Sequence, residues 1–156
     1  EKTSLEEAMT YGKKDLIDYI IENHHSGELD MLDKIDKGLI KLLRAHYDSH
    51  GEELREIYQV FSQMKKNLEL HFIEEEVKDF PAFIERGEIN LEGLREEHES
   101  VGASLKELER LTNDYRAPAD GCNTYRETFR LMKTLQEDIH KHVFLENSVL
   151  FKMEEN

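Results

Sequence analysis

The fold is set by two stretches of this chain, HFIEEEVKDFP (His71–Pro81) and HVFLENSVLF (His142–Phe151). Each stretch begins with a histidine that is followed four residues later by a glutamate, Glu75 in the first and Glu146 in the second. Positions i and i+4 of an α-helix share one face, so each His–Glu pair points into the same space. A buried carboxylate is costly without a partner, and a buried imidazole must hydrogen-bond or bind a ligand. Two such pairs within one helical core therefore indicate bound metal ions.

Apolar residues recur at helical spacing on both sides of these stretches, and no segment alternates as a strand would. The segment YDSHGEE interrupts this pattern near 48–51, and Phe80-Pro81 followed by RGEIN closes the second helix, because a residue before proline disfavours helical geometry. Four long helices joined by short polar loops predict an all-α, up-down-up-down four-helix bundle. The expected elements are a tail or short helix in 1–14, a lead-in helix at 15–24, and helices at 25–46, about 52–78, 90–111 (N-cap Asn90) and about 124–153, with 15–156 forming one domain.

Composition narrows the class of protein further. The 156 residues carry a formal net charge of −14, so a nucleic-acid partner is not expected. No apolar run reaches the roughly 20 residues that span a bilayer, so we expect no membrane partner, and no secretory signal is visible. The single cysteine, Cys122, excludes an internal disulfide and a Cys-rich metal motif, and it favours a reducing, cytoplasmic location. The chain begins with Glu1 rather than methionine, which is typical of a fragment or a processed chain.

Helix direction predicts that four histidines share one layer of the bundle. His25 stands near the start of the first long helix, and His71 lies about 20 residues into the second, which returns to the same level at 1.5 Å per residue. His98 is near the start of the third helix, and His142 is about 18 residues into the fourth. Imidazole and carboxylate suit iron, manganese, zinc or nickel, and two carboxylates in reach of two metal positions are typical of a dinuclear iron or manganese site in a bundle.

The remaining histidines are expected outside this layer. His24 competes with His25 for the same role, and the apolar stripe through Ile21, Leu29 and Leu32 favours His25. The other histidines, His46, His50 and His140, are expected in loops, at helix ends or facing solvent. Glu74 and Glu76 are expected to face solvent or a neighbouring helix.

The two opening stretches, together with ENHH (Glu22–His25) and EEHESVG (Glu96–Gly102), resemble hemerythrin-like domains. More narrowly, they resemble the Repair of Iron Centres family, whose members are di-iron proteins linked to mending iron–sulfur clusters after nitrosative or oxidative stress. The similarity extends from Leu16 to Met153. It implies two iron ions bridged by carboxylate and an oxo or hydroxo group. Terminal ligands would be His25, His71, His98 and His142, and bridging ligands Glu75 and Glu146.

Two departures from oxygen-carrying hemerythrins bear on the expected chemistry. Those proteins have a second histidine four residues after the one in the third helix, where this chain has Gly102, and an aspartate bridge where it has Glu146. Four histidines instead of five imply open positions on both irons, which favours chemistry with NO or oxygen species over reversible oxygen carriage. Full-length members of the repair family also have a small Cys-containing N-terminal domain, which is missing here.

We therefore expect a non-haem di-iron protein that repairs damaged iron–sulfur clusters, by donating iron or by reducing NO, with small ligands such as NO and O2 and damaged iron–sulfur proteins as partners. The sequence leaves open whether the chain is an enzyme; a di-iron NO reductase or a peroxide-directed redox activity is the enzymatic interpretation. The alternatives are an oxygen-binding or oxygen-sensing module and a bundle that a metal merely stabilises.

Overall fold

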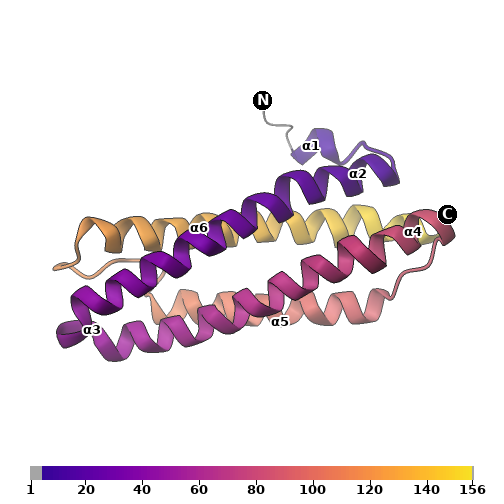
Figure 1. Ribbon diagram of the computed structural model, residues 1–156. Coiled ribbons are helices and arrows are strands. Elements are labelled where there is room, and N and C mark those ends of the chain that lie inside the picture. The colour runs from indigo at the N-terminus through magenta and orange to yellow at the C-terminus, as the bar shows by residue number, and fades with distance from the viewer. Residues whose placement is uncertain (1–4, 156) are drawn as a thin grey trace.

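A computed structural model describes residues 5–155, which are helical apart from short connections, with no strand in that range (Figure 1). The expectation of an all-helical chain is confirmed. Residues 1–4 of the expected tail at 1–14, and residue 156, lie outside the described residues. The elements are α1 (Leu5–Ala8), α2 (Lys13–Tyr19), η1 (Ile20–His25), α3 (Ser26–Glu74), η2 (Glu75–Asp79), α4 (Phe80–Arg86), α5 (Leu91–Leu111), α6 (Asn123–Phe144), η3 (Leu145–Leu150) and η4 (Phe151–Glu155).

Helix α3 turns back on itself in the middle. His46 (φ −122°, ψ 18°) and His50 (φ −134°, ψ 20°) leave helical geometry, and the chain reverses between them. The reversal falls in the segment YDSHGEE, where the sequence predicted a break. The two limbs of α3, residues 26–45 and 51–74, run alongside α5 and α6 in one elongated bundle (Figure 1).

The first long helical run begins earlier than expected. Helix α2 continues without interruption through η1 into α3, because the junction residues Ile20 and Ser26 both have right-handed helical geometry. The expected lead-in helix at 15–24 is therefore not a separate element but the opening turns of this run.

The second long run ends later than expected, because Pro81 does not close it. Helical geometry continues through η2 and α4 to Arg86 and ends at Gly87, whose left-handed φ of 69° suits glycine. Pro81 lies in the first turn of α4, where its missing N–H is tolerated, directly after the wide turn of η2. The next helix, α5, begins as predicted for the third long helix. The Asn90 side chain caps it by accepting a hydrogen bond from the Gly93 backbone N–H at 3.1 Å.

Three segments are π-helical: η1, η2 and η3. Each contains one residue of the expected metal layer, namely His25, Glu75 and Glu146 respectively. A π turn adds a residue to the helical repeat and re-aims the side chains around it, and such turns are common at functional sites. Periodicity analysis assumes a constant repeat, so the sequence did not predict these turns.

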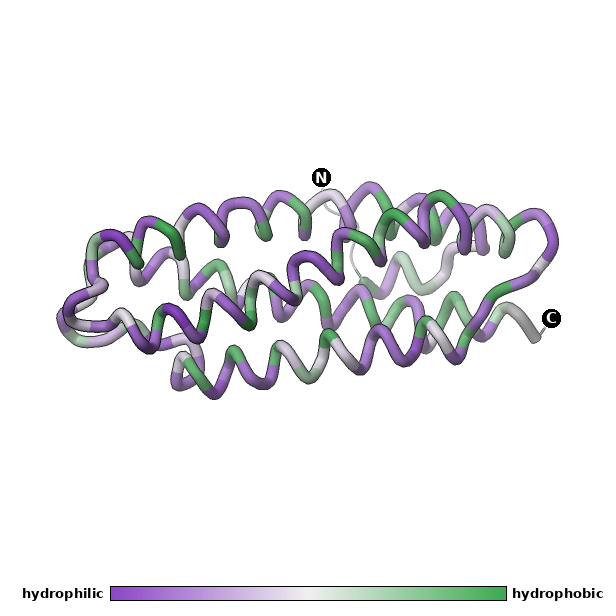
Figure 2. The backbone as a smooth tube through the Cα atoms, turned by 60° about the horizontal axis from the view of Figure 1, so that its bottom comes forward, coloured by the Kyte–Doolittle hydropathy of each residue, from purple (hydrophilic) through white to green (hydrophobic). Residues whose placement is uncertain are grey.

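The apolar core is divided into two clusters, and Figure 2 shows the apolar residues spaced along the helices that supply them. The larger cluster fills the bundle between the reversal of α3 and Phe72. The smaller one joins α2, η1, α4 and η3 at the other end, around Ile20, Phe83 and Leu150. The expected metal layer lies between the two and is enclosed by apolar side chains. None of the described helices is both long and apolar enough to cross a bilayer.

Candidate metal centre

The structure brings all six predicted site residues together. His25 ends η1, His71 lies in the last turn of α3 and Glu75 begins η2, whereas the other three come from α5, α6 and η3. Every one of the six is at most 9 % exposed, and both glutamates are completely buried. The six residues are His25, His71, Glu75, His98, His142 and Glu146.

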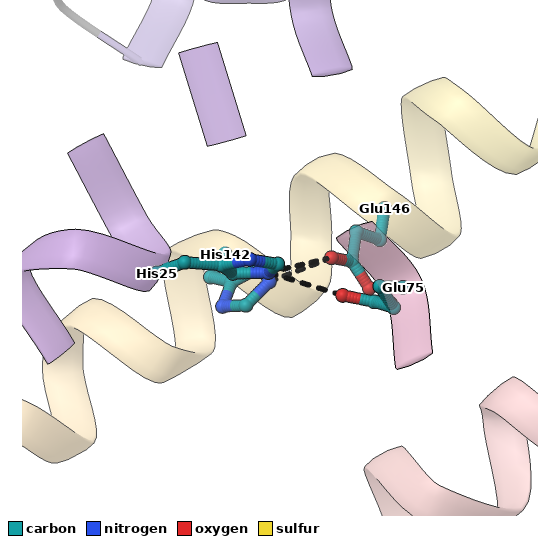
Figure 3. Close-up of side chains that lie close together, drawn as sticks. All are labelled: His25, Glu75, His142 and Glu146. Carbon is teal, nitrogen blue, oxygen red and sulfur yellow. Dashed lines mark hydrogen bonds and ion pairs between the residues drawn. The ribbon is translucent and has the colours of Figure 1, made fainter. Parts of the chain in front are cut away.

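These residues form two groups that share their carboxylates. In one group, ligand atoms of His25 and His142 lie within 4.8 Å of one another and of both glutamates (Figure 3). In the other group, ligand atoms of His71 and His98 also lie within 4.8 Å of one another and of the same two glutamates. Two positions that share two carboxylates are the arrangement needed to hold a pair of cations side by side.

The individual contacts show how the sharing works, because each of the four carboxylate oxygens faces a different imidazole. Glu75 Oε1 lies 3.0 Å from His25 Nε2, and Glu75 Oε2 lies 3.1 Å from His71 Nε2. Glu146 Oε1 lies 2.8 Å from His98 Nε2, and Glu146 Oε2 lies 2.6 Å from His142 Nε2. Each glutamate therefore turns one oxygen to each group.

Most of these inward-facing atoms lack a hydrogen-bond partner, although they are buried. They comprise Nε2 of His25, His71 and His98, both oxygens of Glu75, and Oε1 of Glu146. Apart from the hydrogen bond between His142 Nε2 and Glu146 Oε2, the short N–O distances thus arise from atoms arranged around common points and not from hydrogen bonds. Buried polar atoms without partners are rare in native proteins, and a bound cation satisfies all of them at once. The donor set therefore fits a pair of metal ions.

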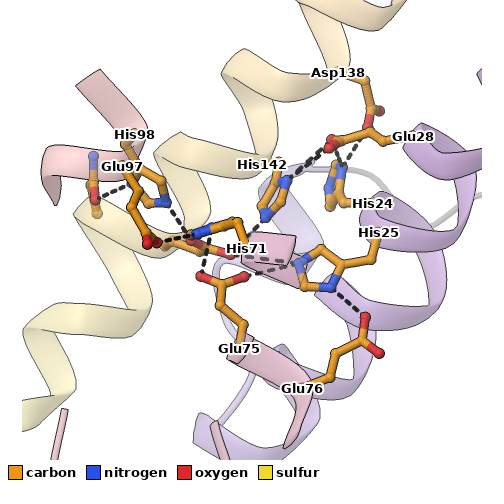
Figure 4. A network of polar contacts seen from close by, with 12 residues as sticks. His24, His25, Glu28, His71, Glu75, Glu76, Glu97, His98, Asp138 and His142 are labelled. Atoms are coloured by element: carbon orange, nitrogen blue, oxygen red, sulfur yellow. Dashed lines mark hydrogen bonds and ion pairs between the residues drawn. The ribbon is translucent and has the colours of Figure 1, made fainter. Parts of the chain in front are cut away.

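A second set of polar residues orients the imidazoles from outside (Figure 4). Each of the four histidines has its Nδ1 in contact with an oxygen acceptor, which leaves Nε2 free to bind a metal when Nδ1 carries the proton. Sequence reasoning did not identify three of these acceptors, and it left Glu76 facing solvent or a neighbouring helix. The acceptors are Glu76 for His25 (2.7 Å), Glu97 for His71, Asn147 for His98 (3.1 Å) and Glu28 for His142 (3.1 Å).

The electrostatics show that the two buried glutamates favour positive charge in the layer. Burial and, after it, the charge of Glu146 raise the pKa of Glu75 to about 8. Burial lowers the pKa of His25 to about 4, with His142 acting in the same direction. For His71, burial also favours the neutral form, but contact with Glu75 outweighs it and raises the pKa to about 9. Two buried carboxylates therefore draw protons onto the site, and a divalent cation would replace those protons.

One further cluster next to the site was missed. His24 and Glu28 repeat the His-x-x-x-Glu spacing of the two opening stretches, and together with Asp138 they form a third group of ligand atoms within 4.8 Å. The repeated spacing was the signal that could have identified this cluster. Sequence reasoning treated His24 only as an alternative to His25, but the structure buries both imidazoles.

The other histidines lie away from the metal layer. His46 and His50 flank the reversal of α3, where His46 Nε2 is 3.3 Å from Cys122 Sγ and His50 Nε2 is 2.9 Å from Asp120 Oδ1. His140 is exposed, as expected.

The fold and the site define a class of protein, a helical domain that binds cations between paired histidines and shared glutamates. Residues 16–153 match the Hemerythrin HHE cation binding domain, and the chain belongs to this hemerythrin family.

Several iron–sulfur cluster repair proteins are similar to most of this chain. The chain is 29 % identical over 145 residues to the iron–sulfur cluster repair protein ScdA of Staphylococcus epidermidis, which covers 88 % of the chain and 64 % of ScdA. It is 26 % identical over 152 residues to the iron–sulfur cluster repair protein DnrN of Neisseria gonorrhoeae, covering 95 % and 94 %. It is 25 % identical over 143 residues to the iron–sulfur cluster repair protein YtfE of Escherichia coli O1:K1, covering 88 % and 64 %. The chain thus spans somewhat under two thirds of ScdA and YtfE and nearly all of DnrN.

Proposed function

We propose that residues 15–156 form one di-iron domain that repairs iron–sulfur clusters damaged by nitrosative or oxidative stress. The observation that carries this proposal is the sharing of Glu75 and Glu146 between two histidine pairs. The names of the relatives from Staphylococcus, Neisseria and Escherichia supply the biological role. The limbs of α3, with α5 and α6, would then form the up-down-up-down four-helix bundle expected from the sequence.

In this proposal each histidine pair completes one metal position. His25 and His142 hold one iron, and His71 and His98 hold the other. Glu75 and Glu146 bridge the pair, and their two negative charges offset the repulsion between adjacent cations. Imidazole and carboxylate are suitable ligands for ferrous and ferric iron.

The surrounding residues leave room for a small ligand at this centre. When bound, the iron pair supplies redox capacity and open positions for NO or oxygen species. A Cβ added at Gly102 would meet no atom within 4 Å. A cavity of about 340 Å³ lies between α5, which supplies His98 and Gly102, and α6, which supplies Phe144. The chain's own role is to hold the ions in a dry layer and to leave one side accessible.

Iron donation and NO reduction are the two candidate chemistries, and the second would make the chain an enzyme. Damaged iron–sulfur proteins are the proposed partners, as the names of the relatives suggest. A cytoplasmic location belongs to the same proposal, because iron–sulfur proteins and the unpaired thiol of Cys122 both suit a reducing compartment.

Metal analysis combined with Mössbauer spectroscopy, on protein isolated from cells, tests the proposal. We expect about two irons per chain with the spectrum of a coupled pair. Changing Glu75→Leu or Glu146→Leu should abolish the pair, whereas Glu74→Leu, one residue away and outside both groups, should retain it. Retention of two irons in both bridging variants, or a single zinc in the wild-type chain, would contradict the assignment.

A second candidate is an oxygen-binding or oxygen-sensing module, which membership of the hemerythrin family also favours. A spectral change that reverses when oxygen is removed would support this candidate. Irreversible oxidation to a stable diferric form would favour repair.

A further inference from the structure

The cluster of His24, Glu28 and Asp138 lies directly behind the metal layer (Figure 4). Glu28 is fully buried, and both of its oxygens lie 3.1 Å from Nδ1 of His142. His24 is 5 % exposed, and its ring stacks on that of His142 with centroids 5.5 Å apart. Asp138 differs from the other two because its side chain is 28 % exposed. The cluster therefore connects the metal layer to the surface.

We propose that His24, Glu28 and Asp138 form a third divalent-metal site, separate from the paired positions. His24 Nδ1 lies 3.0 Å from Asp138 Oδ2 and 4.0 Å from Glu28 Oε2. Two atoms that bind one ion at roughly 2.1 Å can be at most about 4.2 Å apart, so both separations allow a shared ion. One imidazole and two carboxylates suit Fe²⁺, Mn²⁺ or Zn²⁺, and the two negative charges match a divalent cation.

Within residues 5–155, these carboxylates have only imidazoles as ion-pair partners, namely His24 and His142. Among residues 5–155, no lysine or arginine forms an ion pair with Glu28 or Asp138. His24 Nδ1 is the ring nitrogen that faces both carboxylates. A divalent cation bound between this nitrogen and the carboxylates would offset their negative charge.

The position of the site gives it a role that rests on the proposed function. The protein supplies three ligands, and because the Asp138 side chain is 28 % exposed, water can complete the coordination. Fewer protein ligands and greater exposure make this ion more exchangeable than the buried pair. Glu28 reaches both this ion and His142, so the site lies on a route by which iron enters or leaves the centre.

A manganese titration of the iron-loaded chain tests the site. The protein is loaded with iron, oxidised in air and titrated with Mn²⁺, and free Mn²⁺ is followed by electron paramagnetic resonance. An excess of Mg²⁺, which binds imidazole poorly, occupies the acidic surface. We expect one additional Mn²⁺ per chain, with at least tenfold weaker binding in Asp138→Asn and no change in iron content.

The neighbouring exposed residue Glu137 provides the matched control, because Glu137→Gln removes the same charge outside the cluster. His24→Gln repeats the test with the ligand from η1, and His140→Gln, at an exposed histidine, is its control. Binding of no additional Mn²⁺ by the wild-type chain, or equal binding by Asp138→Asn, would overturn the third site and leave the iron pair intact. A chain that held no iron would overturn the proposed function instead. In that case, the third site would still be supported if Asp138→Asn bound one Mn²⁺ fewer than the wild-type chain.

Discussion

Glu76 Oε2 lies 2.7 Å from Nδ1 of His25, so a carboxylate one residue beyond the shared Glu75 fixes the imidazole across the bundle. Both glutamates belong to η2, and its wide turn allows adjacent residues to contact opposite nitrogens of the same ring. The contact holds the proton on Nδ1 and turns Nε2 toward the metal layer.

Replacing Glu76 should therefore weaken the centre without destroying it. Glu76→Ala is expected to lower metal affinity about 10- to 100-fold, the range typical of a lost outer partner. Competition with a chelator measures the change. Glu74→Ala is the control, since Glu74 belongs to neither ligand group. Equal losses in the two variants would show that charge, not the contact with His25, is responsible.

Replacing Gly102 and Gly38 by alanine should change the stability of the fold in opposite directions. A Cβ at Gly102 meets nothing within 4 Å, so Gly102→Ala should stabilise α5 by about 0.5–1 kcal/mol. A Cβ at Gly38 would lie under 3.0 Å from the Thr128 hydroxyl and 3.1 Å from its methyl, so Gly38→Ala should destabilise the packing of α3 on α6. Thermal melts of the two variants measure both effects. Stabilisation by Gly38→Ala would show that Thr128 yields without cost.

The ion pair between His50 and Asp120, a clamp at the reversal of α3, should stabilise the fold to an extent that depends on pH. Contacts with Asp120 and then Glu53 raise the pKa of His50, and the contact with His50 lowers the pKa of Asp120. The pair therefore stabilises the fold between these two pKa values. Its contribution is complete below the ordinary histidine pKa of about 6.5, is lost as pH rises through the raised pKa of His50, and is lost again in acid as Asp120 is protonated.

Comparing Asp120→Asn with the wild-type chain measures this contribution. The difference in melting temperature should be largest near pH 5–6 and should vanish in alkali. Asp48→Asn is the control, because Asp48 is an exposed carboxylate of the same segment that is not in contact with His50. A difference that stayed constant with pH would contradict the clamp.

Core packing and metal binding should be separable. Phe61 is fully buried and lies ten residues before His71, about 15 Å along the helix. Phe61→Ala should cost about 3–5 kcal/mol of the free energy of unfolding, while the folded chain still binds two irons. Leu70→Ala, at a side chain 57 % exposed, should change stability by less than about 0.5 kcal/mol. Denaturant unfolding and metal analysis together check both statements, and loss of iron from folded Phe61→Ala would contradict them.

Much of the site could be predicted because its signals are local. The spacing from His71 to Glu75 and from His142 to Glu146 is a helical turn, and the four histidines fall at one level once helix direction is assigned. The outer residues could not be predicted in the same way. Glu97 and Asn147 carry no periodic signal, since a contact between helices depends on how two surfaces meet.

The sequence by itself determined that the chain is helical, where it reverses, and which six side chains share a layer, because these properties follow from a repeat of 3.6 residues. Only the tertiary structure decided that Pro81 lies within the helical run, that η1, η2 and η3 widen beside the site, and that each glutamate divides its oxygens between two histidine pairs. The physical reason is that local periodicity specifies which face a residue occupies, whereas packing between helices specifies which atoms meet on that face.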